Sequence, residues 1–174
     1  KLLGDALARD PGLRDAYKYL GYAYTKIKKS AAAIEAFKKV LNRDPTDGNT
    51  RNWLVWAEAK GRLEKSLSDP VAYYRLAETN VYDAEFKDAI VNLRQARELG
   101  YDTLAVKKML AVAEQGLKGK SDYANGDLWY NRGDYRQGLG YYERALTAYQ
   151  AIAYLDGEIT ARSSIAWCHL ALFE

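Results

Sequence analysis

The sequence predicts an all-α fold built from antiparallel helical hairpins, and three observations lead to this fold class. First, only three prolines occur, each directly after an aspartate, at Pro11, Pro45 and Pro70. Proline cannot continue a helix and it restricts the residue before it, so each Asp-Pro pair is expected to separate two helices. Second, the segments between the prolines have helical periodicity. Third, small residues recur at fixed distances from large ones.

Helical periodicity extends through most of the chain. In residues 16–26, Tyr17, Leu20, Gly21 and Tyr24 follow the i, i+3, i+4, i+7 spacing of an amphipathic helix, and residues 31–43 show the same spacing. These patterns predict helices over residues 14–27, 30–43, 50–60, 70–82, 86–99, 103–116, 121–132, 135–150 and 157–172.

A glycine in the middle of the first expected helix indicates close helix packing. Gly21 costs its helix up to about 1 kcal/mol relative to alanine, so its presence suggests that another backbone passes close by. Ala33 is expected to be the facing residue. Tyr17, Tyr24 and Phe37 would then fill the space around the crossing.

The spacing of these residues resembles the tetratricopeptide repeat, a two-helix unit of about 34 residues. The first copy reads Tyr17-x2-Leu20-Gly21-x2-Tyr24, Ala33-x3-Phe37, Pro45. The matching positions are Tyr73, Leu76, Ala77, Ala89, Leu93 and Ala96 in a second copy, and Asn125, Gly126, Trp129, Gly138, Tyr142, Ala145 and Leu146 in a third. The resemblance implies an α-solenoid, in which stacked hairpins form a right-handed superhelix with a concave groove.

The copies are irregularly spaced, and the spacing predicts how one solenoid fragment is divided. The expected units are the end of a partial repeat (1–13), a repeat (14–47), a truncated repeat (48–69), a repeat (70–102), an extra helix (103–118), a repeat (119–152) and a terminal helix (153–174). After residue 103 a second phase stays open, in which Leu110 and Ala111 occupy the repeat position. Both ends of the chain look incomplete.

No enzymatic or metal-binding pattern stands out, so we expect no enzyme, no cofactor and no metal. Cys168 and His169 are adjacent and would point about 100° apart on a helix, so they cannot form a nucleophile–base pair. With one histidine and one cysteine, a zinc site would need carboxylates almost alone. Residues 116–121 look faintly like a phosphate loop, but Glu114 holds the first glycine position. We expect a glycine-ended helix followed by a serine cap there.

Charge and hydropathy exclude other classes. The 26 basic and 23 acidic residues are interleaved and give a net charge of +3, unlike the clustered basic face of a nucleic-acid binder. No run approaches the length of a membrane-spanning helix, and no signal peptide is visible. A single cysteine excludes an internal disulfide framework, and cytoplasm and bacterial periplasm both stay open.

The resemblance implies a scaffold that binds a partner protein or peptide in the concave groove. Two alternatives stay open: an RNA-binding helical-repeat protein and an architectural segment of a larger assembly. In this family, the helical stripe beside the packed residues lines the groove. Carried over by position, that stripe contains Lys18, Tyr22 and Lys26 in the first copy, Tyr74, Glu78 and Tyr82 in the second, and Tyr123, Asp127 and Tyr130 in the third. The tyrosines could instead pack between repeats.

The last expected helix is apolar on many sides, whereas a terminal helix of a solenoid normally has a polar outer face. We therefore expect either further repeats beyond it or self-association of the chain through residues such as Trp167, Leu170 and Phe173.

Overall fold

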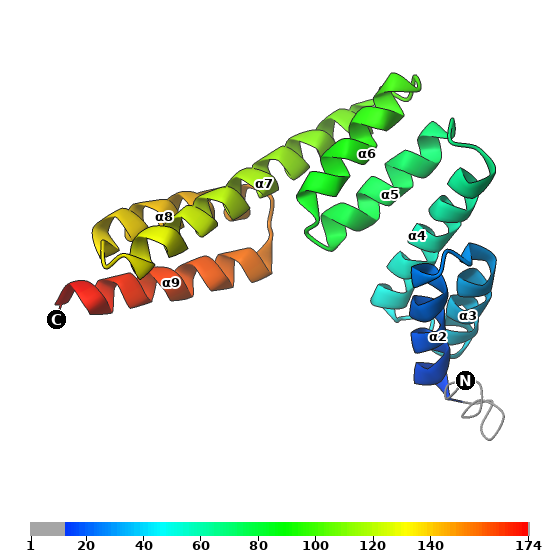
Figure 1. Ribbon diagram of the computed structural model, residues 1–174, viewed down its shortest axis with the longest axis horizontal. Helices are drawn as coiled ribbons and strands as arrows, with labels where there is room; N and C mark the ends of the chain where they lie inside the picture. Colours follow the sequence, from blue (N-terminus) through cyan, green and yellow to red (C-terminus); the bar gives the residue numbers. More distant parts are fainter. Residues whose placement is uncertain (1–12, 174) are drawn as a thin grey trace.

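The structure, a computed structural model, describes residues 13–173, and its helices follow one another as antiparallel neighbours (Figure 1). The helices are α2 (Arg14–Lys26), α3 (Ser30–Arg43), α4 (Gly48–Lys65), α5 (Pro70–Tyr82), α6 (Phe86–Glu98), α7 (Leu104–Asn131), α8 (Tyr135–Ala151) and α9 (Leu155–Phe173). The described residues contain no strand. The predicted all-α solenoid is confirmed. The expected partial repeat at 1–13 lies outside the described residues except for Leu13.

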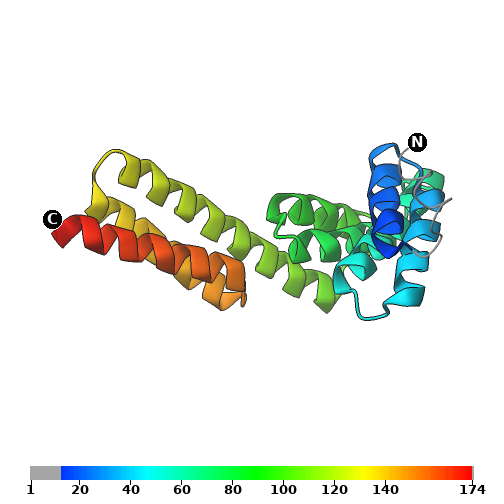
Figure 2. The same cartoon turned by 90° about the horizontal axis from the view of Figure 1, so that it is seen from below.

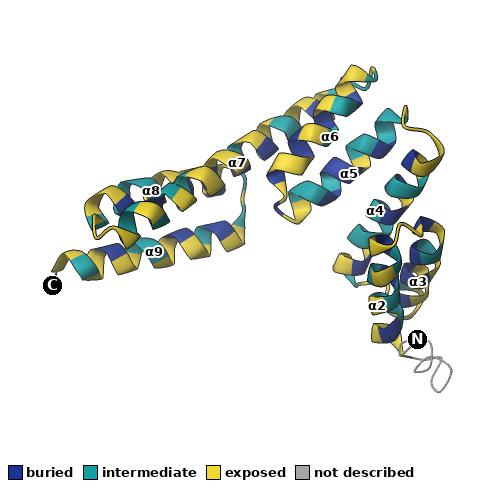
Figure 3. Cartoon of the chain, viewed as in Figure 1, coloured by how far each residue is buried: buried dark blue, intermediate teal, exposed yellow. Residues whose placement is uncertain are grey.

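Each helix packs mainly against the helices before and after it in the chain. Helices α2 and α3, α5 and α6, and α7 and α8 form hairpins, and α9 packs against α8. The segment expected as a truncated repeat contains the single helix α4, which packs against both α3 and α5. Buried residues accordingly lie between neighbouring helices along the whole molecule, without a central core (Figure 3).

Short polar side chains fix where several helices begin. The carboxylates of Asp47, Asp69 and Asp134 accept backbone N–H groups at the starts of α4, α5 and α8. Pro70 occupies the first turn of α5, where its missing N–H costs no intrahelical hydrogen bond. The Asp69–Pro70 pair thus separates two helices by starting the second one.

Rings packed against glycines hold the first and third hairpins together. Gly21 lies against the ring of Phe37, and a Cβ atom on Gly126 would lie 2.6 Å from Cδ1 of Tyr142. Both pairs are 16 residues apart. The second copy has Ala77 and Leu93 at the same spacing, and both are buried in one cluster. Where alanine replaces glycine, the aromatic ring is thus replaced by the smaller leucine side chain.

This packing corrects the expectation for the first helix crossing. The group directly over Gly21 is the Phe37 ring rather than Ala33, although Ala33 is fully buried in the same hairpin. Close backbone approach is seen in the third copy, where a Cβ atom on Gly138 would lie 3.3 Å from the Gly126 carbonyl oxygen.

The expected helix break near residues 116–121 is wrong, because α7 is continuous from Leu104 to Asn131. Gly116 and Gly119 are buried in the middle of this helix. A Cβ atom on Gly116 would lie 2.5 Å from the ring of Phe86 in α6, and one on Gly119 would lie 2.6 Å from the ring of Tyr149 in α8. These glycines admit aromatic rings from two other helices, and that packing offsets their poor helix propensity.

The continuous α7 joins two groups of helices (Figures 1 and 2). Val106 and Ala113, in its first half, are buried with residues of α5 and α6. Gly119 and Gly126, further along, pack against tyrosines of α8. Residues expected to form an extra helix and the first helix of a new repeat are therefore one helix with two sets of neighbours.

A matched pair of glycine substitutions tests the ring packing. Gly126→Ala should lower the free energy of unfolding by about 1–3 kcal/mol, since the added methyl overlaps the Tyr142 ring. Gly140→Ala, also in a helix interior, should raise it by about 0.5–1 kcal/mol, because nothing lies within 4 Å of the added methyl. Urea unfolding of both variants measures the difference, and equal shifts would show that the Tyr142 ring does not require Gly126.

Candidate binding site between helices α7, α8 and α9

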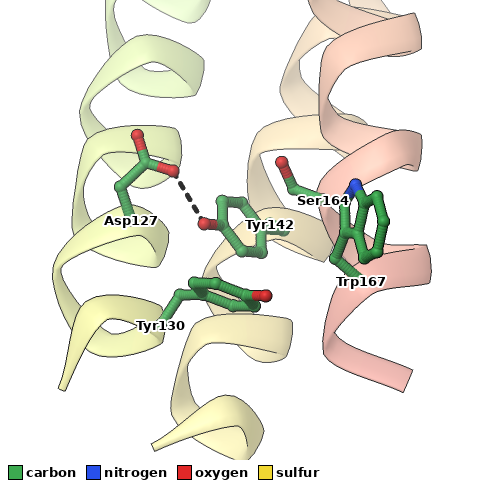
Figure 4. A pocket seen from close by; sticks show the side chains of 5 residues that line it. All are labelled: Asp127, Tyr130, Tyr142, Ser164 and Trp167. Carbon is green, nitrogen blue, oxygen red and sulfur yellow. Dashed lines mark hydrogen bonds between the residues drawn. The ribbon is translucent and has the colours of Figure 1, made fainter. Parts of the chain in front are cut away.

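A cavity of about 410 Å³ opens between the last three helices (Figure 4). Asp127 and Tyr130 come from α7, Tyr142 from α8, and Ser164 and Trp167 from α9. Asp127 and Tyr130, like Ser164 and Trp167, are three residues apart, so each pair lies on one face of its helix. Three antiparallel helices thus supply a carboxylate, three aromatic rings and a hydroxyl to one space.

One wall of this cavity is fixed by hydrogen bonds. The Tyr142 hydroxyl donates to Oδ1 of Asp127 at 2.7 Å. Burial raises the pKa of Tyr142, and the hydrogen bond to Asp127 raises it further, so this hydroxyl stays protonated at neutral pH. Behind it, the Tyr123 ring lies 5.2 Å from the Tyr142 ring, and the hydroxyls of Tyr123 and Ser164 are 2.8 Å apart.

The rings on the open side are held less tightly. Tyr130 packs edge-to-face on Tyr135 at the start of α8, with ring centroids 5.1 Å apart. Trp167 is 59% exposed. Both side chains therefore present ring surface to a ligand without having to leave the core.

The structure brings the three groove residues expected from the third copy to this place. Asp127 and Tyr130 line the cavity, and Tyr123 supports its wall. Tyr142, Ser164 and Trp167 were not expected there. The repeat spacing predicts that Tyr142 packs between helices, and the apolar pattern of the last helix predicts that Trp167 is exposed. No sequence pattern singles out Ser164.

In the first copy, two of the three expected groove residues contact other parts of the chain. Lys18 Nζ donates to Oδ2 of Asp47 at 2.9 Å. The ring centroids of Tyr22 and Trp53 lie 5.0 Å apart, and burial raises the pKa of the Tyr22 hydroxyl. Lys26, at the end of α2, is exposed.

The second-copy residues are also spread over different contacts. The Tyr74 ring packs on Tyr101 at 5.5 Å, and its pKa is raised by burial. Glu78 pairs with Arg75 at 2.7 Å. Tyr82 is 59% exposed and donates its hydroxyl to Asn49 Oδ1 at 3.1 Å.

Other sites singled out from the sequence show no catalytic geometry. Cys168 is fully buried, and burial raises the pKa of its thiol, whereas His169 is exposed. Within residues 13–173, no group of three histidine, cysteine or acidic side chains is placed to hold a metal ion. None of the helices in this part of the chain is long and apolar enough to cross a membrane.

An exposed side of α9 is apolar, and it includes the cavity residue Trp167. Trp167, Leu170 and Phe173 are 59%, 57% and 89% exposed and lie three residues apart along one side of the helix.

Comparison with known proteins identifies two repeats. The sequence pattern of the tetratricopeptide repeat matches residues 15–47 and 126–158. No curated protein matches the chain. Two solved structures of the protein MamA resemble it at 21% and 20% identity, covering 91% and 97% of this chain and 90% and 84% of theirs, with TM-scores of 0.28 and 0.25. Superposition this poor carries no information on function.

The contact of Lys18 with Asp47 generates a pH-dependent prediction. The hydrogen bond from the Thr50 backbone, aided by Lys18, lowers the pKa of Asp47 to about 2. Asp47→Ala should cost about 0.5–2 kcal/mol at pH 7, since it removes the cap of α4. Because the folded pKa lies below the unfolded value of about 3.9, this contribution is present above about pH 4 and is lost toward pH 2. Urea unfolding from pH 7 to pH 3 should show that the difference in unfolding free energy between Asp47→Ala and the wild type becomes smaller. A difference that stays constant over this range would contradict the lowered pKa of Asp47.

Self-association through α9 stays a prediction. Pairing of the exposed Trp167, Leu170 and Phe173 side chains would remove apolar surface from water, which favours association. The sedimentation coefficient should rise with protein concentration, and Leu170→Lys should suppress the rise. Tyr19→Lys, at a 60% exposed site on α2, is the control. A concentration-independent coefficient for the wild type would exclude this contact.

Proposed function

We propose, from the tetratricopeptide repeats matched at residues 15–47 and 126–158, that the chain is a scaffold that holds a partner polypeptide in the cavity between α7, α8 and α9. Repeats of this family are protein-interaction modules, whose stacked helices provide extended binding surfaces. The observation that carries the proposal is the gathering of Asp127, Tyr130, Tyr142 and the exposed Trp167 around one open cavity.

The chemistry of this cavity suits a polypeptide. Tyrosine and tryptophan combine a large rigid contact area with a polar group, and they are enriched among the residues that dominate binding energy in interfaces. Tyr123, Tyr142 and Asp127 are already positioned by hydrogen bonds within the chain, so little ordering is needed on binding.

The location follows from what the other copies do. Lys18 and Tyr22 in the first copy, and Tyr74 in the second, contact other helices or loops of the same chain. Their side chains contribute to stability where they lie. Tyr82 in the second copy is exposed as well, but the third copy gathers several aromatic rings and a carboxylate around one cavity, and we therefore place the core of the groove there.

An RNA partner fits less well. Phosphate groups are bound by basic side chains, whereas the charged residue lining this cavity is the carboxylate of Asp127. A carboxylate repels phosphate at short range.

Selection of peptides tests the proposal. A phage-displayed library of random peptides, each of about a dozen residues, is selected on the immobilised protein, and enriched peptides are synthesised with a fluorescent label. Trp167→Ala and Tyr130→Ala should each weaken binding about fivefold or more, equivalent to about 1 kcal/mol. Melting temperatures should change little for Trp167→Ala, because its side chain is largely exposed.

Tyr19→Ala, which removes an exposed ring from α2, is the matched control and should leave peptide affinity unchanged. Failure to enrich any peptide, or enriched peptides that bind both pocket variants as tightly as wild type, would contradict a binding site in this cavity.

A further inference from the structure

Asp127 supplies the carboxylate of the cavity. Its Oδ1 accepts the Tyr142 hydroxyl, which is neutral. Among the described residues, Asp127 forms no ion pair within 4.0 Å. A negative charge beside aromatic walls is less well solvated than one in bulk water, so a cation that reaches it gains a stronger attraction than at an open surface.

Four arginines on or beside these helices have other contacts or line another cavity. Arg132 lies over the Trp129 ring, 5.2 Å from its centroid. Arg144 contacts the Tyr141 ring and pairs with Asp122 at 3.6 Å. Arg162 pairs with Glu158 on α9. Arg136 lines a different cavity with Asp134 and Gln137. None of these residues is among those lining the cavity of Asp127.

Aromatic rings surround the same space. Figure 4 shows Tyr130, Tyr142 and Trp167 arranged around it together with Asp127. The face of an aromatic ring attracts a cation within about 6 Å of its centroid, and the attraction grows when water is displaced. Rings plus one carboxylate therefore favour a positively charged group over a neutral or negative one.

From this arrangement we infer that the cavity accepts one basic side chain, arginine or lysine, of the bound polypeptide. The inference rests on the proposed function and specifies its partner: a segment with a basic residue that enters the cavity and apolar neighbours that cover Trp167. An apolar side chain would desolvate Asp127 without compensation, a neutral hydrogen-bond donor would compensate it only in part, and an acidic side chain would be repelled. The cavity thus selects by charge, and the exposed indole adds apolar contact.

The peptides selected from the random library provide the probe. Enriched sequences should share one arginine or lysine beside apolar residues. Replacing that arginine by citrulline removes the charge and keeps the length of the side chain. Replacing that lysine by norleucine removes the charged ammonium group and keeps the four-carbon chain. This change should weaken binding to the wild-type protein about tenfold.

A double-mutant cycle assigns the effect to Asp127. Asp127→Asn removes the charge and keeps an oxygen acceptor for the Tyr142 hydroxyl. In this variant the uncharged and charged peptides should bind almost equally. Glu143→Gln, which removes an exposed carboxylate from α8 outside the cavity, is the control and should preserve the tenfold difference. If Asp127→Asn does not fold, the peptide substitutions on the wild-type protein decide the question.

The outcomes separate the two proposals. Peptides that lose affinity with Trp167→Ala but share no basic residue, or that tolerate citrulline or norleucine, would overturn the basic-side-chain inference and leave the binding site standing. An acidic residue shared by those peptides would overturn it as well. Peptides insensitive to Trp167→Ala, or no enriched peptides at all, would overturn both.

Discussion

The contact between an aromatic ring and a glycine of the neighbouring helix is the interaction on which the rest of this structure depends. Gly21 with Phe37, Gly116 with Phe86, and Gly126 with Tyr142 all place a ring where no Cβ atom could fit. A stack of helices has no central core, so each interface must be densely packed by itself. Glycine lets the ring approach the backbone, and the buried ring area offsets the weak helix propensity of glycine.

The same packing shapes the candidate site. Tyr142 lies against Gly126 with its ring and donates its hydroxyl to Asp127, so one side chain both holds the α7–α8 hairpin and forms the cavity wall. Because α7 continues through Gly116 and Gly119, the helix that packs on α6 also carries Asp127 and Tyr130. The site is therefore built on a helix that belongs to both groups of hairpins.

Residues that look equivalent by position have different uses along the chain. Lys18 pairs with Asp47, which caps α4, although the two are 29 residues apart in the sequence. Tyr22 packs on Trp53 for the same reason, since α4 lies beside the first hairpin. The position within a repeat does not distinguish Lys18 and Tyr22 from Asp127 and Tyr130. Their contacts differ because the next helix places different residues opposite them.

The sequence by itself determined the helices other than α7, the hairpin order and the resemblance to the tetratricopeptide repeat, because periodicity, Asp-Pro breaks and small-to-large spacing act over one or two turns or within one hairpin. Only the tertiary structure decided that α7 is continuous, since the rings that compensate Gly116 and Gly119 come from α6 and α8. The tertiary structure also decided which residues form the cavity, because the packing of α9 against α8 brings Ser164 and Trp167 to the same cavity as Asp127. These residues are about 30–40 positions apart in the sequence, beyond the reach of any local pattern.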